Sequence, residues 1–202
     1  MCNVKYTFSE DGSVAYGHLP DGIVFMVDTA SLDKIAGISF YRNYRDLTGK
    51  ILYVMDRHRK QLHRHLVDVP KGYEVDHINL DTLDNRLCNL RICTHQQNQC
   101  NQPRQRNNTS GVTGVSFYKP RGKYRARIKI CQHDIHLGYY QTFEEAVQAR
   151  NVGMACMFGD YGRYDEVEEI PPWIEEDVIN RCKRFVGLSI CESFIDFVKN
   201  AA

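Results

Sequence analysis

The segment KYRARIKI, at residues 123–130, alternates without a break between basic side chains and apolar or aromatic ones. In a β-strand, successive side chains point to opposite faces, so this stretch predicts one strand with two chemically different faces. The face toward a core would carry Tyr124, Ala126, Ile128 and Ile130. The opposite face would carry Lys123, Arg125, Arg127 and Lys129. GVTGVSFYK before it and DIHLGYY after it are typical of two neighbouring strands.

A helix is predicted directly after these strands, at residues 142–159. Apolar residues recur there at positions 143, 146, 147, 154, 157 and 158, which is the spacing of one helix face. Thr142 and Glu145 form a capping box at its start, and Gly159 supplies a stop at its end. Three strands followed by one helix predict a small, self-contained α+β unit.

The flanking regions have weaker patterns. Short strands rich in β-branched and aromatic residues are expected at residues 22–27, 37–41, 50–55 and 61–67. Thr94 is placed to cap a helix that begins in THQQNQCN. Residues 101–111 combine a proline with polar side chains and predict a linker. Near the end, the apolar spacing of VINRCKRFVGLSICESFIDFV predicts one or two helices.

The charge of the chain is unevenly distributed although its total is small. Lys and Arg number 26 and Asp and Glu 25, which gives 26 − 25 = +1. Residues 101–133 hold eight of the bases and no acid, whereas residues 165–177 hold seven acids and no base. Such blocks are usually solvated faces or tails. Because the basic block coincides with the predicted strands, it indicates a polyanionic partner.

The composition predicts a cytoplasmic protein without a membrane segment. No apolar run approaches the roughly 20 residues of a membrane helix, and MCNVKYTFSEDG at the start lacks the features of a secretory signal. The eight cysteines are therefore expected to stay as thiols. None of them lies in a C-x-x-C pair, so a zinc site built from cysteines is not expected.

Polar side chains gather in YEVDHINLDTLDNRLCNLRICTHQQNQCNQ, residues 73–102. Asp76 and His77 diverge if they end a strand, so one could hold a hard cation such as magnesium or manganese while the other faces a water. An imidazole can accept a proton from that water near neutral pH. Asn98, 21 residues after His77, offers a second oxygen ligand. The competing interpretation is that these residues have no catalytic role, because Asp-His pairs are common on surfaces and asparagines are turn formers.

The stretch from residue 61 to residue 102, with its VDHIN, LDNR, NLR and QN pieces, resembles the HNH endonucleases of phages and mobile introns. That family folds as a ββα-metal hairpin. The resemblance implies that His77 is the general base, and that Asp76 and Asn98 hold one divalent metal ion, magnesium or manganese. It also implies that Asn89 ties the hairpin loop together and orients the base. His95 is the alternative to Asn98, because three residues separate the two on one helix face.

Residues 109–165, with KYRARI, HLG and TFEEA, resemble the ethylene-response-factor (APETALA-type) DNA-binding domain. That family reads the DNA major groove with Arg and Trp side chains of a three-stranded sheet. Tyr124 and His136 stand here near positions that often carry Trp. The DNA-binding residues implied are Lys119, Arg121, Lys123, Arg125, Arg127, Lys129 and His136. No acid interrupts the basic face of residues 123–130, which argues against a merely solvated surface.

These patterns predict an α+β protein. An N-terminal domain of short strands would end in the ββα-metal (HNH) hairpin, followed by a small three-stranded antiparallel sheet packed on one helix, and by a helical tail. The expected parts are an HNH endonuclease domain, a linker, a DNA-binding domain, and an acidic segment with the helical tail. They would occupy residues 1–102, 103–110, 111–165 and 166–202.

The predicted function is metal-dependent cleavage of double-stranded DNA in a bacterial or phage-infected cell. No small-molecule cofactor is expected, and homing biology is implied by the resemblance alone. The alternative is a non-catalytic, DNA-binding transcriptional regulator in which the hairpin persists only as a fold. An RNA-binding or structural protein would fit the basic sheet, but it would leave Asp76, His77 and Asn98 unexplained.

Overall fold

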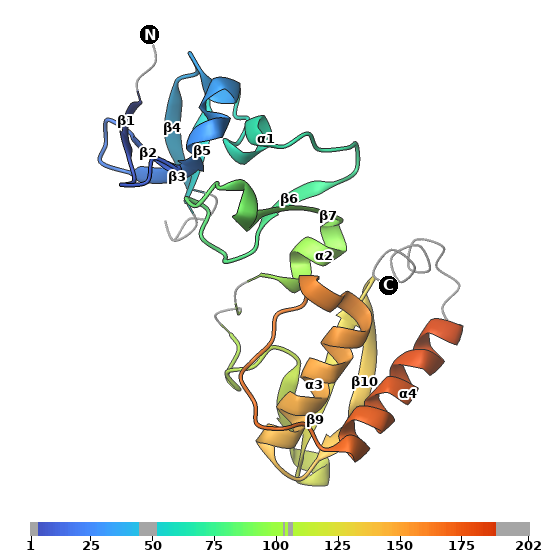
Figure 1. The fold of residues 1–202 in the computed structure, drawn as a ribbon. Helices are drawn as coiled ribbons and strands as arrows, with labels where there is room; N and C mark the ends of the chain where they lie inside the picture. Colours follow the sequence, from blue (N-terminus) through green and yellow to red (C-terminus); the bar gives the residue numbers. More distant parts are fainter. Residues whose placement is uncertain (1–3, 45–51, 103, 105–106, 189–202) are drawn as a thin grey trace. The chain divides into compact units, whose positions relative to one another are not determined.

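The computed structural model describes residues 4–44, 52–102, 104 and 107–188. Contacts between residues divide the chain into two compact units, with the boundary between Asn98 and Gln99 (Figure 1). Helices and several small antiparallel sheets give an α+β fold. None of the described helices is both long enough and apolar enough to cross a membrane.

The N-terminal unit is built from short strands with brief helical turns between them. Its strands are β1 (Lys5–Phe8), β2 (Val14–His18), β3 (Val24–Asp28), β4 (Phe40–Tyr44), β5 (Leu52–Asp56), β6 (Glu74–His77) and β7 (Leu90–Cys93). Its helical segments are η1 (Thr29–Ile35), α1 (His63–Leu66), η2 (Leu87–Asn89) and α2 (His95–Cys100), the last of which continues past the unit boundary.

The described strands of this unit form three separate antiparallel sheets. Strands β1, β2 and β3 form one sheet, while β4 pairs with β5 and β6 pairs with β7. Phe25 of β3 and Phe40 of β4 are completely buried and meet edge to face, with ring centroids 6.3 Å apart. The core around these rings joins β3 to the β4–β5 hairpin. Strands β1 and β2 were not predicted, whereas β3, β4 and β5 overlap predicted segments.

The strand predicted at residues 61–67 is wrong, because α1 occupies this segment. A strand would turn Leu62, Arg64 and Leu66 to the same face and so carry the guanidinium into the core. In the helical turn, Leu62 and Leu66 are both buried, with 1% and 2% exposure, while Arg64 is half-exposed. Burial of the two leucines without the arginine therefore favours the helix.

The C-terminal unit is a three-stranded antiparallel sheet packed on helices. Its strands are β8 (Val115–Tyr118), β9 (Lys123–Ile130) and β10 (His133–Tyr140), in the order β10-β9-β8. Its helical segments are η3 (Lys119–Arg121), α3 (Phe143–Phe158), η4 (Gly159–Tyr161) and α4 (Pro172–Leu188). The three predicted strands and the helix after them are present, and the capping box of Thr142 and Glu145 forms in both directions.

The core of this unit lies between the sheet and α3. Ala126, Ile128 and Ile130 of β9 are buried against it, as the alternation predicted. Helix α4 runs beside α3 and also packs on β10 (Figure 1). Ile174 and Val178 of α4 are completely buried in the same core. The described part of the predicted tail is therefore integral to the C-terminal unit, and residues 189–202 lie outside the described residues.

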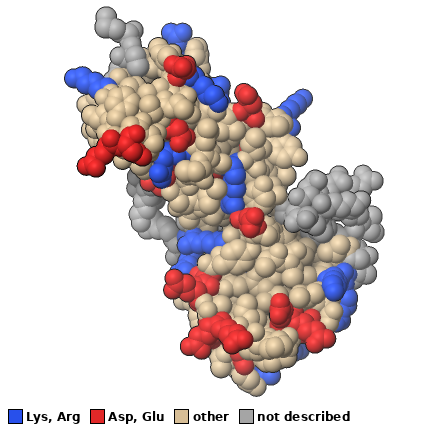
Figure 2. Space-filling view, in the orientation of Figure 1, with Lys and Arg blue, Asp and Glu red and all other residues tan. Residues whose placement is uncertain are grey.

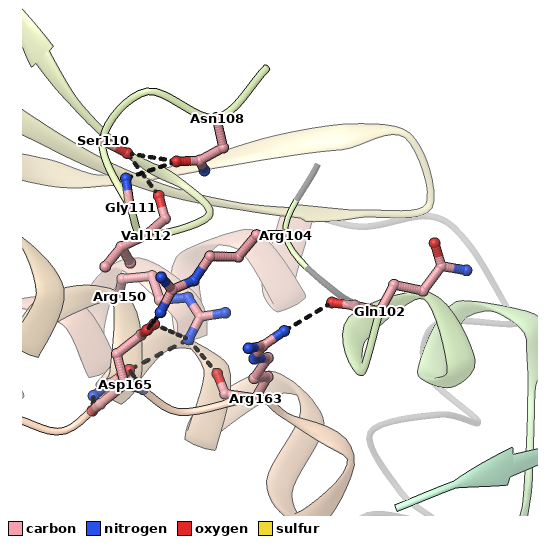
Figure 3. A network of polar contacts seen from close by, with 10 residues as sticks. Gln102, Arg104, Asn108, Ser110, Gly111, Val112, Arg150, Arg163 and Asp165 are labelled. Atoms are coloured by element: carbon pink, nitrogen blue, oxygen red, sulfur yellow. Dashed lines mark hydrogen bonds and ion pairs between the residues drawn. The ribbon is translucent and has the colours of Figure 1, made fainter. Parts of the chain in front are cut away.

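A polar network holds the segment before β8 against the loop after α3 (Figure 3). Arg104 donates to Asp165 at 2.6 Å, and the backbone carbonyl of Arg163 accepts a hydrogen bond from the buried Arg150. Asn108 caps the turn at Gly111 by accepting from its amide at 2.8 Å. Residues 103, 105 and 106 of the predicted linker lie outside the described residues, but Arg104 and Asn108 belong to the structure of the C-terminal unit.

Candidate active site and nucleic-acid interface

The β6–β7 hairpin carries the candidate catalytic side chains. Alternation along β6 turns Glu74 and Asp76 to one face of the hairpin and His77 to the other. Asp76 and His77 are nevertheless both buried, with 6% and 4% exposure. Asp76 lies opposite Arg91 of β7 in the strand register.

Asn89 fastens the loop between the two strands. Its Oδ1 accepts from the backbone amide of Asn79 at 2.9 Å, and its Nδ2 donates to the backbone carbonyl of Asp84 at 2.8 Å. The amide of Ile78 donates to the backbone carbonyl of Asn89 at 2.9 Å. The side chain therefore bridges the beginning and the middle of a loop that contains little regular structure.

The N-terminal sheet holds the same loop from outside. The amide of Met26 in β3 donates to the carbonyl of Leu83, and the amide of Asn85 donates to the carbonyl of Met26, both at 2.8 Å. Asp28, at the end of β3, accepts from the amide of Leu87 at 2.6 Å. These contacts make β3 a fixed support for the loop that follows His77.

His77 packs against two aromatic rings. Its ring meets His63 of α1 edge to face with centroids 5.0 Å apart, and Tyr53 of β5 lies 6.2 Å away. Its Nε2 is 3.2 Å from Oδ1 of Asn85. Burial lowers the pKa of His77 below its usual value of 6.5, and the contact with Asn85 opposes this only in part. The ring is therefore neutral at neutral pH, as a base must be.

His63 is a candidate site residue that was not predicted, because residues 61–67 were interpreted as a strand. It is 3% exposed, and burial lowers its pKa to about 3, with a further contribution from neighbouring His77. A second neutral imidazole therefore packs against the first. Its only signal in the sequence is the concentration of histidines in HRH, residues 63–65, close before the DH pair.

Asp76 is held by an ion pair across the hairpin. Arg91 donates to its Oδ2 from Nε at 2.9 Å and from Nη2 at 2.7 Å. The side chains of Arg91 and Asp76 are 15% and 7% exposed, so the pair is largely withdrawn from water. The carboxylate predicted to bind metal therefore has a cation beside it already.

Glu74 contacts both alternatives for the second metal ligand, Asn98 and His95. It accepts from Asn98 Nδ2 at 2.5 Å and lies 2.9 Å from His95 Nδ1. Burial opposes the charge of Glu74, but the contacts with Asn98 and His95 outweigh it and lower its pKa. The His95 side chain is 71% exposed, whereas Asn98 is half-buried and lines a cavity of about 290 Å³ together with Tyr53, His63, Arg64 and Glu74.

The donor atoms of this region fit a hard cation in their chemistry. Asp76 offers a carboxylate oxygen, and Asn98 offers its amide oxygen because its nitrogen is engaged by Glu74. Magnesium prefers such oxygen donors and usually keeps several waters or phosphate oxygens as further ligands. Among the residues that the structure describes, no group of three or more His, Cys, Asp or Glu side chains is placed to hold a metal ion. A site here would therefore rely on few protein ligands.

The outer face of the β8–β10 sheet carries most of the predicted DNA-binding residues. Arg125, Arg127 and Lys129 alternate there with the buried side of β9, and His136 of β10 is exposed opposite Arg127. Lys123 lies on the same face, and Lys119 and Arg121 are in η3 next to it. Burial lowers the pKa of His136, and the charges of nearby arginines lower it further.

Tyr118 and Tyr139, which were not among the predicted DNA-binding residues, complete this face. The guanidinium of Arg121 lies 4.4 Å from the ring centre of Tyr139, and that of Arg125 lies 5.5 Å from the ring centre of Tyr118. The two rings are themselves 5.2 Å apart. Cation–π contacts hold the cations in place without neutralising them. A strict period of two would have placed Tyr139 on the inner face with Ile135 and Leu137. The register shift between His136 and Gly138 instead turns it to the outer face, opposite Arg125.

Residues 123–130 contain no acid, but an acid of the neighbouring strand reaches the basic face. Asp134 of β10 lies 2.8 Å from Arg127 Nη1, because the hairpin turn brings the two strands into register. Both side chains are about half exposed, at 46% and 49%, so water screens the pair. On the face of this unit that carries α3 and α4, Figure 2 shows Asp and Glu side chains together with a smaller group of Lys and Arg. Both signs of charge are therefore present on the helical side of the unit.

Comparison with known proteins gives a family for part of this arrangement. Residues 57–100 match the HNH endonuclease family. This HNH segment, residues 57–100, contains α1, the β6–β7 hairpin, the loop fastened by Asn89, and α2. It does not contain β3, which supports the loop from outside.

Two viral proteins are similar to the chain. Protein 3.8 of Escherichia phage T7 is 38% identical over 60 residues, which cover 30% of this chain and 50% of the phage protein. An uncharacterised HNH endonuclease of Acanthamoeba polyphaga mimivirus is 29% identical over 145 residues, covering 68% of this chain and 74% of the viral protein. The chain thus spans half the length of the first relative and about three quarters of the second. No solved structure matches the chain significantly.

The mimivirus similarity extends beyond the HNH segment. It covers 68% of the 202 residues, which is about 137 residues. Wherever such a span begins, it includes residues 66–137, because at most 65 residues can lie outside it on either side. The similarity therefore includes the β6–β7 hairpin and runs on through β8 and β9.

Proposed function

We propose that this protein is a metal-dependent DNA endonuclease in which the N-terminal unit cleaves and the C-terminal unit binds double-stranded DNA. The observation that carries the proposal is the state of His77 within the HNH segment. This imidazole is buried, neutral and held at the end of a strand whose loop is fastened by Asn89. A neutral imidazole can accept a proton from a water, and the carboxylate of the adjacent Asp76 can bind a metal ion.

His77 would act as the general base. As the water oxygen forms its bond to phosphorus, a water proton passes to the imidazole of His77. The bond between phosphorus and the 3′ oxygen breaks, its electron pair stays on that oxygen, and the oxygen takes a proton from a solvent water. The products would be a 5′-phosphate and a 3′-hydroxyl. Asn89 would contribute by keeping the loop after His77 in one conformation, since its amide bridges two backbone groups of that loop.

Asp76 and Asn98 would hold one divalent ion, magnesium or manganese. When bound, such an ion supplies positive charge that stabilises the phosphate and the leaving oxygen. Glu74 would keep the nitrogen of Asn98 turned to itself and so present the amide oxygen to the ion. Half-burial of Asn98, against 71% exposure of the His95 side chain, supports Asn98 as the second ligand.

The basic face of β8–β10 would bind the DNA. Its cations stand on a sheet, which is able to lie in the major groove, and two of them stack on tyrosine rings that restrict their motion. Arginines ordered in advance lose less conformational entropy when they meet phosphates or guanine edges.

One observation favours the alternative, a DNA-binding regulator without catalysis. Arg91 already compensates the charge of Asp76, and a regulator that keeps the hairpin only as a fold would need no more than that pair. The two functions differ in their response to metal. A regulator would bind DNA equally well with or without metal and would never cleave it.

A supercoiled plasmid tests the proposal. The wild type should convert it to nicked or linear DNA with magnesium or manganese and leave it intact with a chelator. His77→Ala should cut about 10²- to 10⁴-fold more slowly while its melting temperature in magnesium still exceeds that in chelator. No cleavage by the wild type with either metal, combined with normal DNA binding, would establish the regulator instead.

A further inference from the structure

Asn85 stands apart from the other asparagines of the loop by its partner. Asn79 and Asn89 use their side chains on the loop itself, through Asp84 and backbone groups. Asn85 Oδ1 instead lies 3.2 Å from Nε2 of His77, and the residue is 1% exposed. A buried amide that faces the imidazole is in a position to determine which ring nitrogen carries the proton.

The orientation of this amide follows from its second contact. Nδ2 of Asn85 lies 3.4 Å from the backbone carbonyl of Thr82, which can only accept a hydrogen bond. The nitrogen therefore belongs on that side, and the oxygen faces His77. Since an amide oxygen cannot donate, Nε2 of His77 must carry the hydrogen. A neutral imidazole has a single N–H, so its lone pair is on Nδ1.

The backbone of Asn85 is fixed independently of its side chain. Its amide donates to the carbonyl of Met26 in β3 at 2.8 Å, and the amide of Met26 donates to Leu83 in return, also at 2.8 Å. Any substitution at position 85 other than proline keeps these two bonds available. The loop can therefore stay anchored on β3 while the contact with His77 is removed.

From this geometry we infer that Asn85 is a positioning residue, which holds the proton of His77 on Nε2 and directs Nδ1 at the water to be activated. The inference rests on the proposed function for its catalytic meaning, but the location of the proton is a property of the protein alone. It also assigns a role to the N-terminal sheet, because β3 supports Asn85 and lies outside the HNH segment.

Nuclear magnetic resonance of the imidazole nitrogens tests the inference without requiring activity. The protein is labelled with ¹⁵N in histidine, and the His77 signals are identified by their loss in His77→Ala. In the wild type at neutral pH, the shift of Nε2 should be that of an N–H and the shift of Nδ1 that of a bare nitrogen. In Asn85→Leu, which matches the size without the oxygen, the two shifts should move toward each other as the tautomers mix.

Kinetics provide the second measurement. A hydrogen bond of ordinary strength biases such an equilibrium by roughly tenfold. Its loss lowers the fraction of the productive tautomer from about nine tenths to about one half, so Asn85→Leu should lower kcat about twofold with little change in KM. Asn85→Asp keeps an oxygen toward Nε2 and should retain the wild-type tautomer and most of the activity. Asn180→Asp, on the exposed surface of α4, adds the same charge in the other unit and serves as its control.

Two results would overturn the inference. One is a wild-type spectrum with the proton on Nδ1. The other is Asn85→Leu with the wild-type tautomer and the wild-type kcat. If Asn85→Leu fails to fold, Asn85→Ser, which is smaller and polar but too short to reach the ring, takes its place with the same expected shifts. A wild type that never cleaves DNA would refute the nuclease, whereas the nitrogen shifts would still decide the role of Asn85.

Discussion

Arg91 of β7 donates two hydrogen bonds across the β6–β7 hairpin to Oδ2 of Asp76, from Nε at 2.9 Å and from Nη2 at 2.7 Å. The pair fixes the carboxylate proposed to bind metal before any metal arrives. It also sets a competition, because a divalent cation approaching Asp76 meets the guanidinium. The ion pair would therefore make metal binding weaker and the metal-free protein more stable than either would be with a neutral residue at position 91.

Replacing Arg91 tests this competition. Arg91→Met keeps most of the side-chain volume and leaves Asp76 as a buried charge without its partner, which should lower the free energy of unfolding by about 3 kcal/mol in chelator. Magnesium should then restore more stability to the mutant than it adds to the wild type. Urea unfolding with and without magnesium measures both quantities. Equal magnesium effects in the two proteins would mean that Asp76 is not a ligand.

Glu74 should act on the metal through Asn98. In Glu74→Ala the amide nitrogen of Asn98 loses its acceptor and the amide can rotate, so magnesium affinity should fall about 10- to 100-fold, as is usual when an outer support of a ligand is lost. Direct loss of the ligands in Asp76→Ala or Asn98→Ala should have a larger effect. Magnesium titrations followed by calorimetry give the affinities.

His95 is the matched control for that experiment, because it also contacts Glu74 but is exposed on α2. His95→Ala should leave magnesium affinity within about twofold of the wild type. If His95→Ala abolishes binding while Asn98→Ala retains it, the second ligand is His95.

His63 should make stability depend on pH. Its pKa is about 3 in the folded protein and near 6.5 when unfolded, so between these values only the unfolded chain binds the proton. Stability from this group is complete above pH 6.5 and is lost as the pH falls toward 3, by up to about 1.4 kcal/mol per pH unit. His63→Phe, which keeps a ring against His77, should flatten the decline. Unfolding free energies from pH 7 to pH 4 measure it, and an unchanged slope would contradict the burial of a neutral imidazole.

The basic face of the C-terminal unit should account for the salt dependence of DNA binding. Each phosphate contact contributes about 0.9 to the slope of log K against log salt. Changing Arg125, Arg127 and Lys129 together to Ala should weaken binding and flatten that slope, with less selective cleavage persisting at high enzyme concentration. Filter binding over a salt series measures the slope. An unchanged slope would make the face a solvated surface only.

The acid on this face provides a change of opposite sign. Asp134→Asn releases Arg127 from its partner and removes one repelling charge, so DNA affinity at low salt should rise. A fall in affinity would mean that Asp134 positions Arg127 for DNA rather than competing with it.

Local patterns were sufficient where the structure is local. The alternation in residues 123–130 and the capping box of Thr142 and Glu145 depend on neighbours in sequence, and both are present in the structure. The α1 turn was missed because Leu62 and Leu66 share a face in a strand as well as in a helix. Only the surrounding core, which excludes Arg64, decides between them.

The candidate site was predictable in its residue types but not in its contacts. The resemblance pointed to Asn89, which fastens the loop, but nothing in LDNRLCN marks Asn85 as the asparagine that faces His77. The partners of Asp76 and Arg127 depend on strand register, which brings Arg91 and Asp134 beside them from 15 and 7 positions away. Such pairs become visible only once the hairpins are closed.

The hydrogen bonds from β3 to the loop after His77 limit how the HNH segment could be moved to another protein. The family match covers residues 57–100 alone, but Met26 and Asp28 of β3 make three of the hydrogen bonds that hold the loop. If the HNH segment were grafted alone onto another protein, it would keep His77 but lose the three hydrogen bonds from β3. An exchange of the C-terminal unit for another DNA-binding domain should succeed only when the transferred segment begins before β1 and so includes the whole N-terminal unit.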